Sequence, residues 1–215
     1  MWNKQDALNL IHDTALIPII RVESADTAFK VADSFLEGGV NIIEVTFSVP
    51  GAAEVVEELT EEMGQDVLIG TGTVLDAQTA RKAILAGSEF IVSPIYSKEL
   101  IEISRRYAKV CIPGALTPTE ILEAYTMGAD AVKVFPNKNV GGPSYIRAVR
   151  APLPQVPLVP TGGVNLENAG PLLEAGSFAL GVGSAITDKE AINQGNFDAV
   201  TQNVKDFLEI VKEYR

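Results

Sequence analysis

The chain has 215 residues, of which 47% are hydrophobic and 21% are charged, and this composition is typical of a globular protein. Its net charge of −11 argues against binding to nucleic acid or to an anionic membrane, because both need a basic surface. No apolar stretch approaches the ~20 residues of a transmembrane helix, and the first residues are too polar for a signal peptide, so we expect a cytoplasmic protein.

Short β-rich segments alternate with amphipathic helical segments along the chain, and glycine or proline separates them. An additional helix is predicted first, over residues 2–13. The eight predicted strands cover residues 15–21, 41–47, 67–74, 89–94, 110–115, 131–136, 158–164 and 178–185. The clearest helices between and after them cover residues 24–37, 76–86, 119–127 and 197–214.

Residues typical of helix boundaries support this assignment. Short polar residues that cap helix N-termini stand at Ser24, Asp76, Thr117 and Asn165. Thr117 is followed by Pro118 and Glu120, as in a capping box with proline at the first helical position. Glycines suited to a left-handed helix end precede the next strand at Gly38, Gly39, Gly87, Gly128 and Gly176.

The order of these elements predicts an α/β fold. Strands that read as nearly continuous apolar runs, with helices between them, are typical of a parallel sheet covered on its outer face. Eight such units without a linker predict a single (β/α)₈ TIM barrel domain over residues 1–215, with the extra N-terminal helix covering the barrel bottom. An open doubly wound sheet is the alternative.

One lysine interrupts the apolar strand at residues 131–136. Strand alternation places Lys133 on the same face as Ala131 and Phe135. Burial of an ammonium group is costly, so Lys133 is either half of a structural ion pair or a functional amine, and the strand alone favours neither. Loss of hydration would lower the pKa of the amine and make it nucleophilic.

A carboxylate interrupts the second strand in the same way. Glu44 shares a face with Ile42 and Thr46, and if that face is the barrel interior, Glu44 would meet Lys133 across the barrel. The two residues would then form either a plain salt bridge or an acid–base group beside an amine nucleophile. Buried ion pairs are a poor source of stability, which favours the catalytic interpretation.

Three further polar residues fall at strand ends. Arg21 ends the first strand, Thr73 follows Ile69 and Thr71 in the alternation of the third, and Thr161 ends the seventh. The C-terminal ends of barrel strands meet at one rim, where active sites are built. Alone, Arg21 would pass for a surface arginine, but together the three indicate a site.

Glycine-rich loops follow the last two strands. Gly162 and Gly163 lie at the end of the seventh predicted strand, and Gly181, Gly183 and Ser184 lie at the end of the eighth. Glycines let backbone N–H groups approach an anion, and these two loops are the usual phosphate site of a barrel. The simpler explanation, that the glycines only permit tight turns, is less favoured because both loops are glycine-rich.

Metal ligands are scarce in the sequence. The only histidine, His12, lies in the first helix, away from the rim, and the only cysteine, Cys111, lies in an apolar run as expected of a buried inert thiol. We therefore expect no metal and no disulfide within the chain.

Several segments in order resemble the 2-keto-3-deoxy-6-phosphogluconate (KDPG)/4-hydroxy-2-oxoglutarate (KHG) aldolases of class I. They are Glu44-Val45-Thr46, residues 70–74, Ser93-Pro94, Pro113-Gly114, residues 117–120, residues 133–136 and residues 160–164. The resemblance covers nearly the whole chain, and the ordered set is far more specific than any one segment.

The resemblance implies a homotrimeric (β/α)₈ enzyme that releases pyruvate from KDPG, from KHG or from both, with a small, phosphorylated 2-oxo acid as partner. It implies Lys133 as the Schiff-base lysine and Glu44 as the general acid–base residue, and we expect no organic cofactor because the imine would serve as the electron sink. It also implies a substrate-binding set: Arg21 and Thr73 for the carboxylate, Thr161 for hydroxyl groups, Pro94 and Phe135 for the pocket walls, and Gly162, Gly163 and Ser184 for phosphate.

The sequence also departs from the family pattern. Part of the family has arginine where this chain has Ser48, so the carboxylate contact would rest more heavily on Arg21. Arg150-Ala151-Pro152 and Asn137 are read as loop variation.

Three alternative functions remain open at this point. One is the phosphogalactonate (KDPGal) aldolase, for which an aliphatic residue is expected in place of Thr161. Another is a different phosphate-binding barrel, such as an epimerase or a phosphosugar synthase. A third is a non-catalytic phosphosugar-binding barrel.

Overall fold

A computed structural model describes residues 2–215; Met1, the first residue of the predicted domain, lies outside the described residues. The elements in chain order are α1 (Lys4–Thr14), β1 (Leu16–Ile20), α2 (Ala25–Glu37), β2 (Ile42–Thr46), α3 (Ala52–Met63), β3 (Leu68–Gly72), α4 (Ala77–Leu85), β4 (Phe90–Val92), α5 (Lys98–Arg106), β5 (Val110–Ile112), β6 (Gly114–Ala115), α6 (Pro118–Thr126), β7 (Val132–Val134), the 3₁₀ helix η1 (Asn137–Val140), α7 (Pro143–Arg150), β8 (Leu158–Pro160), α8 (Leu166–Glu174), β9 (Leu180–Val182), α9 (Lys189–Asn193) and α10 (Phe197–Tyr214).

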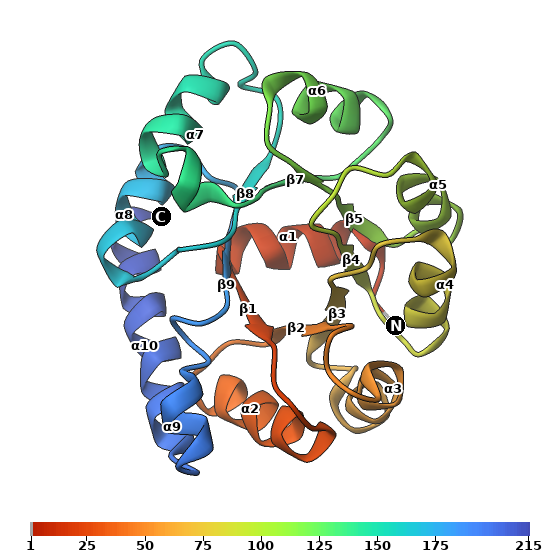
Figure 1. Cartoon of the computed structure of the whole chain (residues 1–215), viewed down its shortest axis with the longest axis vertical. Coiled ribbons are helices and arrows are strands. Elements are labelled where there is room, and N and C mark those ends of the chain that lie inside the picture. The colour runs from red at the N-terminus through yellow and green to blue at the C-terminus, as the bar shows by residue number, and fades with distance from the viewer. Residues whose placement is uncertain (1) are drawn as a thin grey trace.

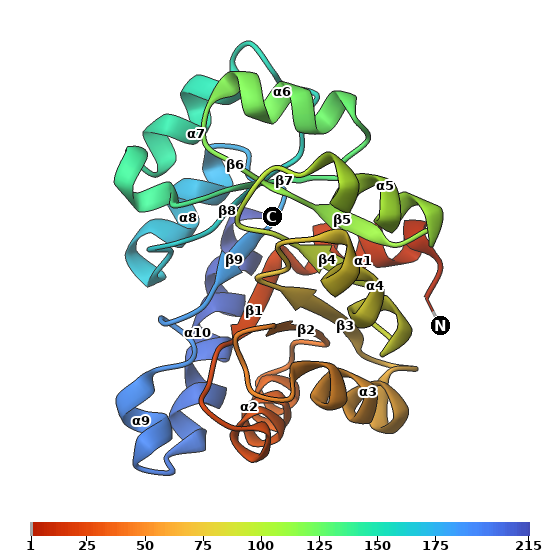
Figure 2. The ribbon, with the colours of Figure 1, turned by 45° about the vertical axis from the view of Figure 1, so that its right-hand side comes forward.

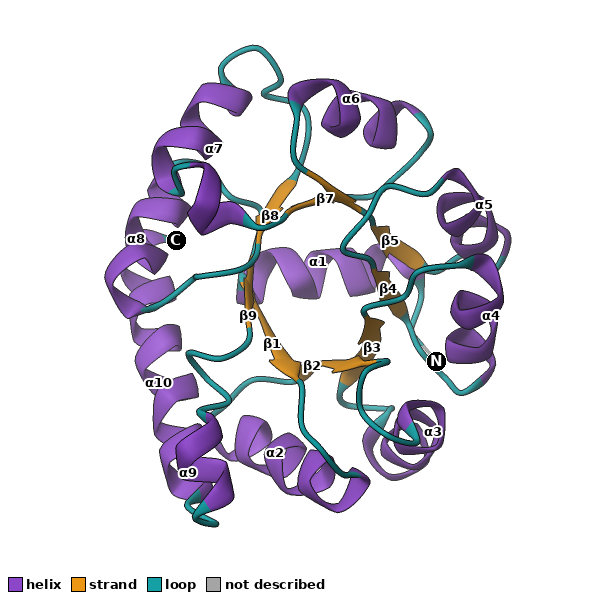
Figure 3. Ribbon diagram, viewed as in Figure 1, coloured by secondary structure: helices purple, strands orange, loops and turns teal. Residues whose placement is uncertain are grey.

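The strands form a ring of parallel strands with the helices outside it (Figures 1 and 3). Hydrogen bonding gives the orders β5-β4-β3-β2-β1-β9 and β6-β7-β8. The two parts join at Pro113, which separates β5 from β6 within one predicted strand. They join again where the Phe178 N–H donates to the Leu158 carbonyl at 2.7 Å and Thr161 bridges Gly181. The predicted barrel is confirmed, with the fifth predicted strand divided in two.

Side chains alternate between the barrel interior and the layer beneath the helices. Ile17, Ile42 and Ala131 belong to one interior cluster. Their neighbours in sequence belong to a second cluster, which also contains buried residues of the outer helices. This alternation fixes the direction of the polar residues, because Glu44 and Lys133 each lie two positions beyond an inward-facing residue.

Helix α1 covers one end of the barrel, as predicted. Its Ala7 and Ile11 are fully buried in the same interior cluster as the inward-facing strand residues. Figure 1 shows α1 crossing the ring of strands, and the turned view in Figure 2 shows the outer helices flanking it. Helix α1 therefore covers the apolar interior of the barrel at this end.

The predicted helix boundaries are largely confirmed. Each of the four predicted N-cap side chains accepts a hydrogen bond from the first turn of its helix, and Thr117 and Glu120 form the full capping box. The expected glycines have left-handed backbones at Gly39, Gly87, Gly128 and Gly176. Gly38 is the exception, because it caps α2 with a right-handed backbone at φ −71°, and the left-handed residue is Gly39. Within residues 2–215, no helix combines the length and apolar character needed to cross a membrane.

Candidate active site

A cavity of about 630 Å³ opens at the C-terminal ends of the strands. It is lined by nine of the ten residues predicted for the site: Arg21, Thr73, Pro94, Lys133, Phe135, Thr161, Gly162, Gly163 and Ser184. Glu44, the tenth, is not among the lining residues. Six strands and the loops that follow them thus bring residues from positions 21 to 184 to one place.

Lys133 occupies the middle of β7 and points into the barrel. Its side chain is 5% exposed, and its Nζ lies 5.2 Å from the centre of the Phe135 ring. Burial lowers the pKa of the Lys133 amine from its usual value; Glu44 opposes this shift and Arg21 adds to it. A larger fraction of the amine is therefore neutral near pH 7 than for a surface lysine, and only the neutral amine is nucleophilic.

Glu44 lies in the middle of β2 and is 2% exposed. Burial raises the pKa of its carboxyl group, and the positive charges of Lys133 and Arg21 lower it. The carboxylate packs directly against Gly72 of β3, where an added Cβ would overlap Oε1 and lie 2.6 Å from Cδ. Glycine at position 72 therefore makes room for the carboxylate.

Lys133 and Glu44 interact without touching. Among residues 2–215, no ion pair with an N···O distance within 4.0 Å joins them, although each shifts the pKa of the other. Burial raises the carboxyl pKa and lowers the amine pKa, so the two values move closer together. A carboxyl group and an amine whose pKa values approach each other are suited to proton transfer.

Thr73 reaches the cavity by a different route from the one that the alternation predicts. In β3, Leu68 faces the barrel interior and Ile69 faces outward. Thr71 lies on the same outer face as Ile69, where its hydroxyl bonds the Ser88 hydroxyl at 3.1 Å. Simple alternation would therefore turn Thr73 outward as well. The strand instead ends at Gly72, and Thr73 has a left-handed backbone with φ +58°. This conformation is unfavourable for a β-branched residue, and it directs the side chain into the cavity.

Arg21 and Thr73 form one polar wall of the cavity. The Arg21 guanidinium donates to Thr73 Oγ1 at 3.3 Å. Ser48 lies on the same cavity and shares a 2.8 Å hydrogen bond with Thr46, whose hydroxyl donates to the Ile20 carbonyl. Ser48 is therefore held by its own strand, and Arg21 supplies the positive charge at this wall.

A second wall, formed by the loops after β8 and β9, is built from backbone rather than charge. Gly162 and Gly163 have left-handed φ values of +88° and +78°. Within the described part of the chain, the backbone N–H groups of Gly162, Gly163 and Ser184 donate to no backbone carbonyl. Thr161 forms an isolated parallel β-bridge with Gly181, and a Cβ added at Gly181 would overlap the Thr161 hydroxyl. Free N–H groups on glycine loops form a suitable site for a phosphate.

Two charged residues at the cavity mouth were not predicted from the sequence. Lys189, at the start of α9, pairs with Glu23, after β1, at 3.0 Å, and both line the cavity. They are exposed and lie 166 residues apart, and an exposed charge carries no pattern that marks it as functional. The only available signal was that both follow strand ends.

Residues 2–215 contain no group of three or more His, Cys, Asp or Glu side chains that could hold a metal ion. Cys111 is buried, and burial raises the pKa of its thiol to about 12. It is therefore an unreactive thiol packed beneath the helices, as the sequence predicts.

Comparison with known proteins agrees with this geometry. Residues 8–203 match the family model described as KDPG and KHG aldolase. The chain belongs to this family. A 2-dehydro-3-deoxy-phosphogluconate aldolase from Treponema pallidum is 33% identical over 196 residues, which cover 91% of this chain and 93% of the relative.

Solved aldolases have the same fold. A KDPG aldolase from Legionella pneumophila, with pyruvate captured as a covalent carbinolamine intermediate, is 30% identical with a TM-score of 0.84, over 93% of this chain and 96% of that one. A structure described as native KDPGal is 28% identical with the same TM-score, over 93% of this chain and 95% of that one. The chain therefore shares its barrel fold with solved structures of this family.

Proposed function

We propose that this protein is a class I aldolase that cleaves KDPG to pyruvate and glyceraldehyde 3-phosphate, KHG to pyruvate and glyoxylate, or both. The observation that carries the proposal is the buried Lys133 amine, which opens onto a cavity and has a lowered pKa. Family membership supports the reaction type. The alternatives of an epimerase or a phosphosugar synthase give no role to a buried lysine in a strand.

In the first stage, the neutral Lys133 amine attacks the C2 ketone of the substrate. The resulting carbinolamine loses water to give a protonated imine, and Glu44 supplies and removes the protons. Burial raises the pKa of Glu44 above the usual range of a carboxyl group, which suits it to proton transfer because its protonated form becomes more accessible. The reaction proceeds through protein groups alone.

In the second stage, the protonated imine serves as the electron sink. Glu44, directly or through water, takes the proton of the C4 hydroxyl. The C3–C4 bond breaks, its electron pair moves toward the imine nitrogen, and the aldehyde leaves. The enamine of pyruvate that remains is protonated at C3, and hydrolysis releases pyruvate and restores Lys133.

The two walls of the cavity would hold the two ends of the substrate. The carboxylate next to the reacting ketone would bind Arg21 and the Thr73 hydroxyl, which are already hydrogen-bonded. Thr161 would contact the substrate hydroxyl groups, and Pro94 and Phe135 would form apolar walls beside the imine. The phosphate would be held by the free N–H groups of three residues: Gly162, Gly163 and Ser184.

We further propose KDPG rather than KDPGal as the phosphorylated substrate, since Thr161 has a hydroxyl where the galactonate enzyme is expected to be aliphatic. The resemblance to the family also supports a homotrimer, which light scattering on the purified protein would test. Cytoplasmic location stays a prediction, consistent with the free buried thiol of Cys111.

A lactate dehydrogenase-coupled assay tests the function. It should detect pyruvate when KDPG or KHG is added, and the ratio of the specificity constants assigns the preferred substrate. Phosphosugar binding without pyruvate release would instead establish the non-catalytic barrel. Pyruvate release from KDPGal with a larger specificity constant would overturn the assignment from Thr161.

A further inference from the structure

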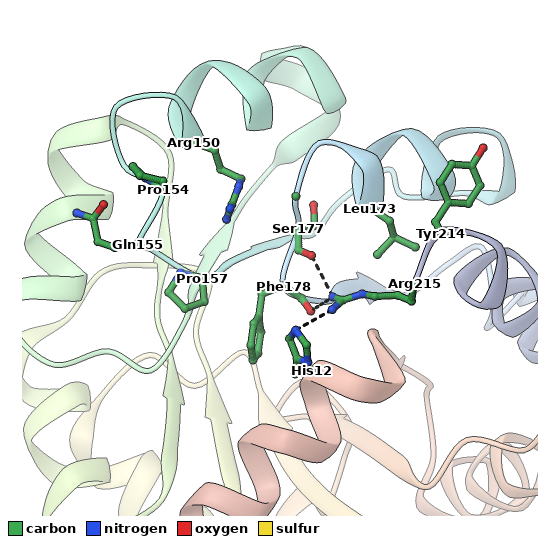
Figure 4. Close-up of a pocket in the computed structure, with 11 residues that line it drawn as sticks. His12, Arg150, Pro154, Gln155, Pro157, Leu173, Ser177, Phe178, Tyr214 and Arg215 are labelled. Carbon is green, nitrogen blue, oxygen red and sulfur yellow. Dashed lines mark hydrogen bonds between the residues drawn. The ribbon is translucent and has the colours of Figure 1, made fainter.

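A second cavity, of about 330 Å³, lies at the other end of the barrel. It is formed where β8 and β9 begin, and its lining includes Pro157 and Phe178, which precede those strands. Helices α1, α7 and α8 and the residues that end α10 complete it (Figure 4). The catalytic cavity lies at the C-terminal ends of the same two strands, so the two cavities are on opposite faces of the barrel.

Arg150, the last residue of α7, brings an uncompensated positive charge to this cavity. Its half-buried side chain packs against Gly176, where an added Cβ would lie 2.5 Å from Nε. Among residues 2–215, its guanidinium has neither a carboxylate within 4.0 Å nor a hydrogen-bond acceptor. Arg147, one turn earlier on the same helix, differs because it pairs with Glu174 at 3.8 Å.

Arg215 brings a second guanidinium and holds it in place. It donates to the carbonyls of Ser177 (3.1 Å) and Phe178 and contacts Nε2 of His12 at 2.8 Å. The His12 ring packs against the Phe178 ring, with centroids 5.2 Å apart. In Figure 4 the side chains of Arg150 and Arg215 both extend into the space above Pro157 and Phe178.

The charge of this cavity contrasts with that of the chain. The protein has a net charge of −11, yet the side chains lining the cavity include two arginines and no Asp or Glu. Asp13, which bonds His12 at 3.0 Å, is a neighbouring carboxylate on the Arg215 side of the cavity. Planar guanidinium groups match the geometry of phosphate and carboxylate oxygens. The rest of the lining includes apolar side chains, namely Pro154, Pro157, Leu173 and Phe178, and the volume is within the range of small-molecule sites, roughly 300–1,000 Å³.

We propose that this cavity is a second binding site, remote from the catalytic one, for a small metabolite that carries a phosphate or carboxylate group. Arg150 is its main ligand, because its donors have no partner in the protein. Arg215 contributes the N–H groups that His12, Ser177 and Phe178 do not use. The proposal uses no residue of the catalytic cavity and does not depend on the aldolase assignment.

Titration of the full-length protein with inorganic phosphate at constant ionic strength, followed by amide NMR shifts, tests the site. Saturable shifts are expected at Ser177 and Phe178, separate from any shifts at Gly163 and Ser184. Arg150→Gln should weaken the binding reported by Ser177 and Phe178 by about tenfold or more, since charge-assisted hydrogen bonds are lost. The binding reported by Gly163 and Ser184 should be unchanged.

Arg147→Gln is the matched control, because it removes the same charge from the same helix but spares the cavity. It should change the dissociation constant by less than about twofold, since it lies outside the site and exposed charges act weakly. Arg150→Lys keeps the positive charge but not the planar guanidinium group, so it should give intermediate affinity. Thermal melting of each variant checks that a loss of binding does not come from a folding defect.

A parallel titration with acetate distinguishes the two headgroups. Binding of phosphate, of acetate or of both supports the site and identifies its ligand class. The proposal is overturned if Ser177 and Phe178 show no saturable shift with either anion. It is equally overturned if Arg147→Gln weakens binding as much as Arg150→Gln, because the effect would then be one of net charge.

Discussion

The packing of Glu44 against Gly72 predicts the effect of a single methyl group on catalysis. In Gly72→Ala, the new Cβ would overlap Glu44 Oε1, and its distance to Cδ would have to increase from 2.6 Å to at least 3.4 Å. The carboxylate must therefore move by about 1 Å. Displacement of a catalytic group on that scale lowers the rate by about 100-fold, so kcat should fall by about this factor.

Gly70→Ala is the matched control for this substitution. Gly70 lies two residues earlier on the same face of β3, and its added Cβ would overlap the Phe90 ring rather than Glu44. Both variants should lose about 1–3 kcal/mol of stability through overpacking. Only Gly72→Ala should lose kcat per folded molecule, measured by the coupled assay with circular dichroism to quantify folded protein.

A double-mutant cycle gives the decisive comparison. If Gly72→Ala acts only by displacing Glu44, it should have little further effect on kcat in a Glu44→Gln background. Additive losses in the double variant, or equal losses of kcat in Gly70→Ala and Gly72→Ala, would refute the assignment of Glu44 as the proton-transfer group.

Three further predictions follow from the cavity walls. Arg21 lowers the pKa of Lys133, so Arg21→Met should raise that pKa and move the acidic limb of the pH–rate profile for imine formation to higher pH. An acidic limb at the same pH in both proteins would contradict the effect of Arg21 on Lys133. Thr73→Gly should relieve the backbone strain at φ +58° and leave the free energy of unfolding unchanged or about 1 kcal/mol higher; a strongly destabilised glycine variant in urea unfolding would argue against strain. Its KM should rise because Arg21 loses its hydroxyl partner, whereas Thr73→Ser should keep the KM of the unmodified protein. We expect Lys189 to attract the substrate phosphate to the cavity mouth, so Lys189→Gln should raise KM for KDPG by up to about fivefold. Glu23→Gln should lower KM, because it releases Lys189 from its ion pair. Equal KM values in steady-state kinetics would remove both residues from the site.

Much of the fold was predictable because local signals agreed with one another. The capping box at Thr117 and the glycine at position 128 mark the two ends of α6, and the alternation of polar and apolar residues places Ile42 inward. The interruption at Pro113 was not predicted, because the strand pattern runs through it without a break. Proline has no N–H to donate to a neighbouring strand, so the ladder divides there.

The candidate site was predictable to the extent that it depends on strand alternation. Lys133 and Arg21 line the cavity from the face that their strands assign. Thr73 lines it only because a left-handed backbone overrides the alternation, and nothing local in the sequence marks that residue as left-handed. The position of Lys189 at the cavity mouth depends on which exposed loop folds over the rim, and contacts between distant segments set this arrangement.

The central claim is that Lys133 forms an imine with a 2-oxo acid. Incubation with pyruvate and borohydride, followed by peptide mass spectrometry, should show a reduced pyruvyl adduct on the peptide that contains Lys133 and a parallel loss of activity. Lys133→Arg should give neither adduct nor turnover. Full activity after this treatment with Lys133 unmodified, or an adduct on another lysine that accounts for the lost activity, would contradict the account.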